Sequence, residues 1–276
     1  MARIARNWRQ VTVIIVLIVY TAFATGPFVW VAIMSLRTTP EISRDPYALP
    51  EPPHFWKFAQ AWFESGYSTY FGNSVLVVLS AVVVVTVIGA MAAHCLARYS
   101  FPGNRAIYFV LFSAIIFPPQ ITIIALFQIL VEYRLYNSLI GLASVYVSFQ
   151  LPITLYILES FFARIPGDLF DAARIDGYSE WSIFWKVSLP VALPAVSTVI
   201  ILNTILLWNE FLYAVVLISD DAKRTLPLGV QKFMGDQFED VGMIATGLMI
   251  AIIPVAVVYV FFSEKLMQGM TAGAVK

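Results

Sequence analysis

The chain has 276 residues, of which 60% are hydrophobic and 12% are charged, and its formal net charge is zero. Soluble domains of this size carry about a quarter charged residues, so the composition excludes an ordinary soluble protein and indicates that lipid is the solvent. No basic stripe suggests a nucleic acid partner, and the single cysteine, Cys95, excludes an intramolecular disulfide.

Six segments are apolar and long enough to cross a membrane, which takes roughly 20 apolar residues in a helix. No polar stretch is long enough to fold separately. We therefore expect an all-α polytopic bundle of six transmembrane helices in a single domain, residues 1–276. The expected spans are 11–36, 72–97, 106–131, 139–163, 191–218 and 242–263.

The first apolar segment follows Arg3, Arg6 and Arg9, which resemble the charged start of a signal peptide. The segment is too long for the apolar part of a signal peptide, and it lacks a small-x-small cleavage site. We expect it to be a retained first helix.

Lysines and arginines near the span ends favour cytoplasmic N- and C-termini, because positive residues accumulate on the cytoplasmic side. In this orientation ten of them lie inside and seven outside, three of the seven in the long loop 37–71. The ten are Arg3, Arg6, Arg9, Arg98, Arg105, Arg164, Arg174, Lys186, Lys265 and Lys276, and the seven are Arg37, Arg44, Lys57, Arg134, Lys223, Arg224 and Lys232.

Prolines lie within several of the expected spans, among them Pro27, Pro118, Pro119, Pro152 and Pro254. Each removes a backbone donor and tends to kink its helix. Any single proline is explained equally well by ordinary irregularity of the helix bundle or by a position that lines a transport pathway. Several kinked helices together favour a transport pathway over a simple anchor.

The motifs of catalysis are missing from the sequence. None of the six lysines precedes Ser or Thr, so there is no P-loop. His54 and His94 with one cysteine are too few for a zinc site, and we expect His94 to be packed or hydrogen-bonded. There is no Gly-x-Ser-x-Gly elbow and no paired carboxylate pattern within the spans. We expect a chain that is not an enzyme and binds no metal or cofactor of its own.

The segment between the fourth and fifth spans, residues 164–190, is the most informative. Asp168 can cap a helix, with Asp171 three residues on, and Gly177 suits the left-handed position that ends one. The pattern predicts a helix of about two turns over 168–177. Ser179 can cap a second short helix, which Pro190 would end.

A short helix of this kind can receive the movement of a motor protein. Ala172 and Ala173 are small enough to allow close approach, and Asp171 and Arg174 offer ionic contacts at the rim. An interfacial helix that rests on lipid explains the same pattern equally well on physical grounds alone.

The segment resembles the EAA motif of type I ABC importer permeases: Glu-Ala-Ala, three residues, Gly, nine residues, Ile, one residue, Leu-Pro. The chain has Asp171-Ala172-Ala173, Gly177, Val187 and Leu189-Pro190 at the same spacings, with Asp in place of Glu and Val in place of Ile. The resemblance implies that the predicted helix is a coupling helix. The residues that it assigns to ATPase coupling are Asp168, Asp171, Ala172, Ala173, Arg174, Asp176, Gly177, Leu189 and Pro190.

Further matches, from about residue 73 to the end, resemble the MalG-like branch, which imports carbohydrates. They are Asn73-Ser74, Leu96-Ala97-Arg98-Tyr99, Phe101-Pro102-Gly103, Phe117-Pro118, Phe161-Phe162, Ile165-Pro166, Trp208-Asn209-Glu210-Phe211 and the tail from Gly269 to Lys276.

The resemblance implies a heteromeric importer in the bacterial cytoplasmic (inner) membrane. Its other parts would be a second MalF-like permease, a homodimeric ABC ATPase that binds ATP and Mg, and an extracytoplasmic solute-binding protein. ATP-driven closure of the ATPase would switch the permeases between inward-facing and outward-facing states.

Five residues of the fifth span are candidates for the substrate path. Asn203, Thr204 and Asn209 could hydrogen-bond to sugar hydroxyls, and Trp208 could stack on a sugar ring. Glu210 lies roughly 30 Å along the helix from Pro190, near the outer boundary, where a charge costs less than at the midplane. We expect Glu210 to make a packing or gate contact more readily than a direct sugar contact.

The loop 219–241 is expected on the outer side. It is explained either as a solvated acidic loop or as a docking site for the binding protein. The docking candidates are Asp220, Lys223, Arg224, Asp236 and Gln237.

Two rival classes remain open on the sequence. An ion-driven secondary transporter would need intramembrane acids, and only Glu159 and Glu210 come close. A membrane-anchored scaffold would not need the kinked spans or the segment 164–190. Within the importer class a sugar or glycoside leads as substrate, with polyols and glycerol phosphates behind it.

Overall fold

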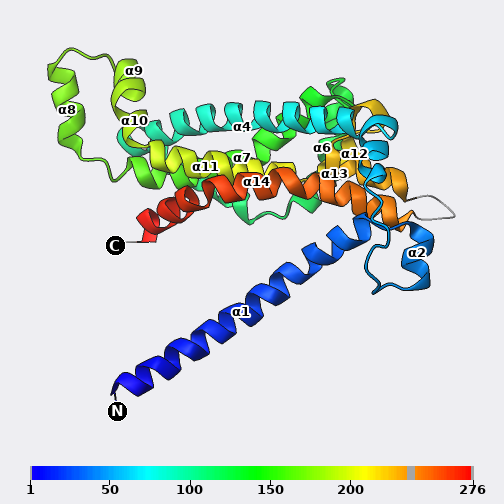
Figure 1. Ribbon diagram of the computed structural model, residues 1–276. Helices are drawn as coiled ribbons and strands as arrows, with labels where there is room; N and C mark the ends of the chain where they lie inside the picture. The colour runs from blue at the N-terminus through cyan, green and yellow to red at the C-terminus, as the bar shows by residue number, and fades with distance from the viewer. Residues whose placement is uncertain (1, 235–239, 275–276) are drawn as a thin grey trace. The chain divides into compact units, whose positions relative to one another are not determined.

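The computed structural model describes residues 2–234 and 240–274, with side chains for 10–118, 120–234 and 240–262. Every regular element within these ranges is helical (Figure 1), as expected for an all-α membrane protein. The long helices are α1 Ala2–Ser35, α4 Tyr67–Arg98, α7 Leu139–Phe162, α11 Leu193–Trp208 and α14 Val241–Ala274. The shorter ones are α2 Thr39–Arg44, α3 Trp56–Ala59, η1 Gln60–Glu64, α5 Asn104–Ser113, η2 Ala114–Ile116, α6 Pro119–Glu132, α8 Gly167–Ile175, α9 Glu180–Ile183, η3 Phe184–Ser188, α10 Leu189–Val191, α12 Leu212–Leu217, η4 Asp221–Lys223, α13 Leu226–Gly229 and η5 Val230–Phe233.

The chain divides into two compact units, each described here by itself. The first comprises Met1–Tyr67 and Val230–Ile252, and the second comprises Ser68–Gly229 and Ile253–Lys276. The expectation of one domain over 1–276 stays a prediction, because compactness alone does not show which parts fold independently.

Two buried cations organise the first unit where α1 ends. Lys57 is 2% exposed, and its Nζ donates to the carbonyl oxygens of Ser35, Arg37 and Gly242 at 3.1, 2.6 and 2.7 Å. Arg37, also 2% exposed, donates to the carbonyl oxygens of Glu41 and Asp45. Carbonyl groups at a helix end lack partners within the helix, so these two side chains connect the ends of α1 and α2 to the start of α14.

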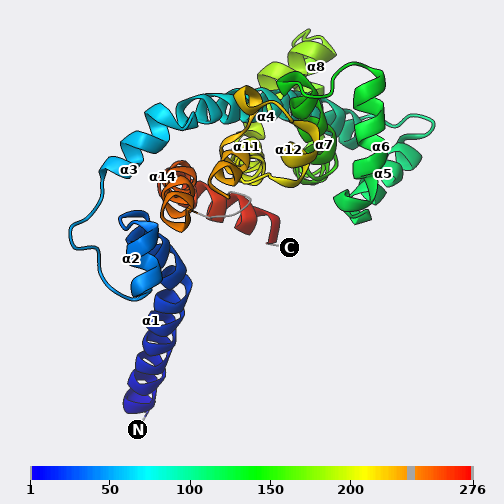
Figure 2. The same cartoon turned by 90° about the vertical axis from the view of Figure 1, so that its right-hand side faces the viewer.

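The second unit is built on α4, α7 and α11, which lie together in Figure 2 while α5 and α6 stand to one side. A Cβ built on Gly89 of α4 would lie 2.5 Å from Cγ2 of Thr154 on α7, so the glycine is what allows these helices to approach closely. Thr154 also accepts a hydrogen bond from Asn203 of α11 at 2.8 Å, and both side chains are fully buried. A polar contact of this kind fixes the register of packed membrane helices.

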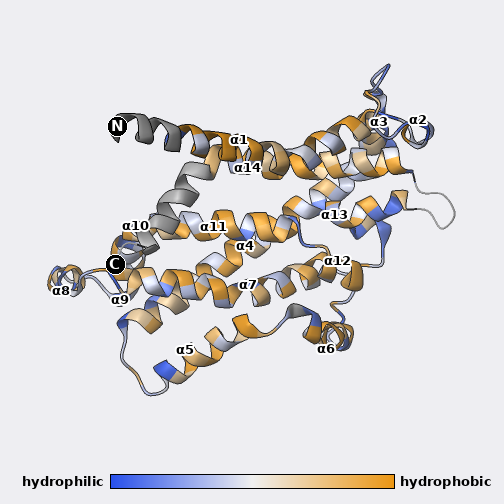
Figure 3. Ribbon diagram, turned by 90° about the horizontal axis from the view of Figure 1, so that it is seen from below, coloured by the Kyte–Doolittle hydropathy of each residue, from blue (hydrophilic) through white to orange (hydrophobic). Residues whose placement is uncertain are grey.

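Among the residues that the structure describes, four helices are long and apolar enough to cross a membrane as continuous elements, namely the stretches Gln10–Ser35, Tyr67–Arg98, Leu139–Phe162 and Val241–Phe262. Two further candidates are bent pairs, Asn104–Ile116 with Gln120–Glu132 at 108° and Glu180–Val191 with Leu193–Trp208 at 76°. Six spans result if each bent pair counts as one. Figure 3 shows the hydrophobic colouring along these helices and the bend between α5 and α6.

The third expected span is bent at the prolines that were expected to kink it, whereas the breaks in the fifth were not expected. Phe117 and Pro118 are extended between η2 and α6, because a proline disfavours the helical conformation of the residue before it. The fifth expected span, 191–218, is divided again at residues 209–211, between α11 and α12. By contrast, Pro27, Pro152 and Pro254 lie inside continuous helices.

Candidate functional site

The predicted short helix exists as α8, Gly167–Ile175, but it begins differently from the expectation. Pro166 occupies the N-cap position, and no side chain caps the helix. Asp168, predicted to be the cap, lies instead in the first turn, where its negative charge favours the positive end of the helix dipole. The prediction failed because proline at 166 already supplies the extended conformation that a cap residue needs.

The end of α8 follows the prediction closely. Gly177 has φ +81°, the left-handed conformation expected of it, and the cap residue is Asp176. The amide of Gly177 donates to the carbonyl of Arg174, and the amide of Tyr178 donates to that of Ala173, both at 3.0 Å. This pair of bonds is the Schellman motif, which closes a helix firmly.

The two faces of α8 have different surroundings. Phe170 and Ala173 are buried, and they belong to a core cluster that includes Ala90 of α4 and Leu158 of α7. Burying a side chain such as Phe170 stabilises the fold by about 2 kcal/mol. Figure 1 shows α8 at the same end of this unit as α9 and α10. The core therefore holds α8 in place even though α8 lies outside the long helices.

The opposite face of α8 is exposed and partly apolar. Leu169, Ala172 and Ile175 follow one another at intervals of three residues, and Ile175 is 87% exposed. The sequence indicated Ala172 and Ala173 as contact residues of this helix, whereas Leu169 and Ile175 were missed. Their helical spacing was the signal that could have identified them. Single exposed apolar residues are common, whereas a stripe on a helix that is fixed to the core suits contact with a partner.

Charged residues border this face. Arg174 donates to Asp171 at 2.9 Å and to Glu180 at 2.8 Å, and these hydrogen bonds raise the pKa of Arg174, the bond to Glu180 being the larger cause. All three side chains are exposed to solvent, so each pair adds little stability by itself. Their effect is to orient one another.

The second short helix is capped as predicted and ends later than predicted. Ser179 accepts a hydrogen bond from the amide of Ser182 at the start of α9. Pro190 does not end the run of helical residues from α9 through η3 to α10, because it lies in the first turn of α10, where proline is tolerated. Leu189 packs against the core cluster, and the change of direction comes at Ala192.

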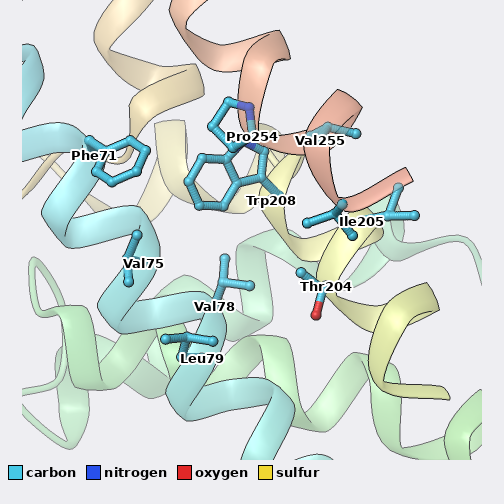
Figure 4. Close-up of a pocket in the computed structure, with 10 residues that line it drawn as sticks. Phe71, Val75, Val78, Leu79, Thr204, Ile205, Trp208, Pro254 and Val255 are labelled. Atoms are coloured by element: carbon cyan, nitrogen blue, oxygen red, sulfur yellow. The ribbon is translucent and has the colours of Figure 1, made fainter. Parts of the chain in front are cut away.

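Of the five candidates for the substrate path, the structure brings together Thr204 and Trp208. Both line a cavity of about 230 Å³ with Phe71, Val75 and Pro254, as Figure 4 shows. The cavity is apolar, and the hydroxyl of Thr204 already donates to the carbonyl of Ile200 at 2.7 Å. The ring of Trp208 meets that of Phe71 edge-on, with the centroids 5.7 Å apart.

The other three candidates point elsewhere. Asn203 is engaged with Thr154 in the interior, and the amide of Asn209 donates to the carbonyl of Ile205. Glu210 accepts from the hydroxyl of Tyr146 at 2.7 Å and from the amides of Tyr213 and Ala214. Glu210 thus caps α12 at the break that follows α11, in a packing role of the kind that the sequence favoured.

The docking candidates of the loop 219–241 are described in part, since Asp236 and Gln237 lie outside the described residues. Lys223 pairs with Asp220 at 3.5 Å, and Arg224 pairs with Asp221 at 3.4 Å. Asn73 of α4 donates to the carbonyls of Ala222 and Arg224, both at 2.9 Å. This part of the loop is therefore fixed to the start of α4.

A bundle of apolar spans with one short helix held on its core outside them has the architecture of a membrane permease subunit. Residues 85–267 match the family described as "Binding-protein-dependent transport system inner membrane component". The chain belongs to this family of ABC importer permeases. It is accordingly a transport subunit of the inner membrane and not an enzyme, which confirms the resemblance drawn from the EAA motif.

Two curated relatives match over nearly the whole chain. The diacetylchitobiose uptake system permease protein of Streptomyces coelicolor is 38% identical over 93% of this chain and 86% of its own length. The trehalose transport system permease protein of Mycobacterium tuberculosis is 33% identical over 100% of this chain and 99% of its own length.

Two solved structures share the fold. A crystal structure of a bacterial ABC transporter that imports the acidic polysaccharide alginate matches with a TM-score of 0.82 and 20% identity, over 94% of this chain and 97% of the other. A second, of an alginate ABC transporter in complex with a periplasmic protein bound to an alginate pentasaccharide, matches with a TM-score of 0.69 and 11% identity, over 94% and 93%.

Proposed function

We propose that this chain forms half of the translocation path of an ATP-driven importer of a sugar or glycoside, and that it is coupled to a separate ATPase through α8. The single observation that supports coupling most strongly is the construction of α8. Its buried face is part of the core, its end is closed by a Schellman motif, and its other face presents Leu169, Ala172 and Ile175 to solvent. A helix built in this way can receive a push and pass it on without deforming.

The complete importer contains, in this proposal, a second MalF-like permease, a homodimeric ABC ATPase and an extracytoplasmic solute-binding protein. ATP and Mg are bound by the ATPase, whose groove takes α8. In this proposal both termini of the chain lie in the cytoplasm, so that α8 faces the compartment that holds the ATP.

The names of the relatives support an oligosaccharide as the substrate. Diacetylchitobiose and trehalose, the sugars in two of those names, are both disaccharides without net charge. The cavity at Trp208 offers few groups for tight binding of such a solute, since only the hydroxyl of Thr204 and the indole of Trp208 are polar among its lining side chains. Selectivity then rests mainly on the binding protein and the second permease. A polyol or a glycerol phosphate is the alternative substrate within the same class.

Replacement of Gly177 by proline tests the coupling role. Proline holds φ near −65° and has no amide hydrogen, whereas Gly177 has φ +81° and donates to Arg174. The variant should leave assembly of the complex partly intact and abolish the ATP hydrolysis that loaded binding protein stimulates. Gly177→Asn is the matched control, because asparagine tolerates the left-handed conformation.

The measurement is ATP hydrolysis by the complex in proteoliposomes, with and without loaded binding protein. Normal stimulation in Gly177→Pro would refute the coupling role of α8. Uptake that depends on an ion gradient and proceeds without ATP would instead support the rival secondary transporter.

A further inference from the structure

The last turn of α4 meets the residues around α8 at both ends of that helix. At the entrance to α8, the guanidinium group of Arg98 donates to the carbonyl of Ile165 and lies 4.1 Å from the ring centroid of Phe170. Ile165 and Phe170 are both buried, with 4% of their surface exposed. Arg98 is the last residue of α4. It therefore joins the end of α4 to the start of α8.

The exit from α8 is held by the next residue, Tyr99. Its hydroxyl donates to the carboxylate of Glu180, and the same carboxylate accepts from Nε of Arg174 at 2.8 Å. Arg174 stands in the last turn of α8. Partial burial and the bond to Glu180 raise the pKa of Tyr99 to about 12, so the phenol keeps its proton and remains a donor at neutral pH.

The space between these two contacts is filled by His94. This ring is 3% exposed, and its centroid lies 5.4 to 6.1 Å from those of Tyr99, Phe162, Phe170 and Phe184. These ring contacts can pass a displacement of α8 on to the end of α4, while a cavity of about 310 Å³ lies beside them, lined by His94, Tyr99 and Glu180. The end of α4 and the helix α8 should consequently move as one body.

At its other end, α4 reaches the cavity. Phe71, Val75, Val78 and Leu79 of α4 line it opposite Trp208. Residues 71 and 98 lie about 40 Å apart along the axis of a continuous helix. A single rigid element thus runs from the contacts with α8 to the wall of the cavity.

We propose that Arg98 and Tyr99 are positioning residues, which clamp α8 at both ends to the last turn of α4 and so transmit its movement to the cavity. This inference rests on the proposed function, since it requires that an ATPase moves α8. It adds that α4 carries the movement, in addition to the chain connections of α8 to α7 and α9.

The test uses Tyr99→Phe, which removes one hydroxyl and keeps the ring that packs on His94. The whole complex is reconstituted with its ATPase and binding protein. Diacetylchitobiose and trehalose are the first probes, and the one that stimulates the unmodified complex is used. In Tyr99→Phe the basal ATP hydrolysis stays unchanged and the stimulated rate falls about fivefold, the size expected for loss of one hydrogen bond to a charged group near the surface.

Tyr178→Phe is the matched control. This tyrosine belongs to the same segment, its ring lies 5.2 Å from Nζ of Lys186, and its hydroxyl makes no hydrogen bond within the part of the chain that the structure describes. It should retain full stimulation. Glu180→Ala removes the acceptor of the Tyr99 hydroxyl together with the partner of Arg174, so it should lose at least as much stimulation as Tyr99→Phe. The double variant should lose no more than Glu180→Ala alone, because both changes break the same connection.

Full stimulation in Tyr99→Phe, or losses that multiply in the double variant, would overturn the clamp while leaving the proposed function standing. If no sugar stimulates an assembled, unmodified complex, the proposed function falls, and the clamp falls with it. A loss in Tyr99→Phe, together with a double variant that loses no more than Glu180→Ala alone, supports the clamp.

Discussion

Glu41 shows how a single side chain organises the start of a helix. Its carboxylate accepts a hydrogen bond from the amide of Thr38, and this bond is part of a capping box at the start of α2. The same carboxylate lies 2.9 Å from Nε2 of His54. The hydrogen bond with His54 is the main cause that lowers the pKa of Glu41 from 4.5 to about 2. Because the pKa of Glu41 is lower in the folded protein than in the unfolded chain, its carboxylate stabilises the fold above about pH 4.5. This stabilisation is lost as the pH falls toward 2.

We expect α2 to loosen over that acidic range. The amide of Ile42, which donates to the carbonyl of Thr38 at 3.0 Å, should exchange its hydrogen progressively faster, relative to the intrinsic rate, as the pH falls from about 4.5 to about 2. In Glu41→Gln the side chain still accepts a hydrogen bond but does not titrate, so this pH dependence should vanish. The same dependence in both proteins, measured by hydrogen exchange and mass spectrometry, would contradict the assignment.

Buried cations of the first unit illustrate a different residue-scale rule. A lysine that is almost fully buried is rare unless it is paired, and Lys57 is surrounded by three carbonyl oxygens instead of a carboxylate. In the sequence it was simply one of the outer lysines counted for orientation. Only the meeting of residues 35, 37 and 242 in space shows that it is structural.

At the scale of elements, the contact of α4 with α7 depends on Gly89. Gly89→Ala should destabilise the second unit by about 1–3 kcal/mol, the usual cost of overpacking, since the new Cβ would meet Cγ2 of Thr154. Thr154→Ser in the same background should restore most of the loss. It removes Cγ2 and keeps the oxygen that accepts from Asn203.

Thermal unfolding of the purified protein in detergent measures these effects. Gly72→Ala is the matched control, because Gly72 lies on the same helix and a Cβ there would meet nothing within 4 Å. Gly72→Ala should be neutral or slightly stabilising, because alanine has the higher helix propensity and fewer conformations in the unfolded chain. A loss at Gly72 equal to that at Gly89 would contradict the assignment of the Gly89 effect to close approach.

For the whole molecule, the orientation in the membrane is the prediction to test. Ser43 and Ser100 are both exposed, and the distribution of Lys and Arg places the first outside and the second in the cytoplasm. In a Cys95→Ser background, Ser43→Cys should react with a membrane-impermeant maleimide in intact spheroplasts. Ser100→Cys should react only after permeabilisation, and the reverse pattern would invert the proposed orientation.

Much of the architecture follows from local sequence alone. A run of about 20 apolar residues has no stable place except the membrane, so the four continuous candidate spans lie where the sequence predicted them, apart from a few residues at their ends. The fifth span, expected at 191–218, differs more, because its bent pair covers Glu180–Val191 and Leu193–Trp208. The left-handed Gly177 and the cap at Ser179 could be predicted because they depend on neighbouring backbone groups only. Even the break at Pro118 has a visible cause, although the prolines inside α7 and α14 show that the residue type alone does not decide it.

The tertiary structure decided which side of each span faces a neighbour. Asn203 and Thr204 are adjacent in α11, yet one is bonded to Thr154, 49 residues earlier, and the other lines the cavity. A helix that is apolar all around carries no signal of its orientation. The sequence could therefore name both residues as candidates, but it could not tell which one faces α7 and which one faces the cavity. Likewise, the apolar spans, and the resemblance of the spacing from Asp171 to Pro190 to the EAA motif, were enough to predict a membrane permease with a short helix between its fourth and fifth spans. Only packing against α4 decided how that helix is held, because the contacts of Arg98 with Ile165 and of Tyr99 with Glu180 join residues 67 and 81 positions apart.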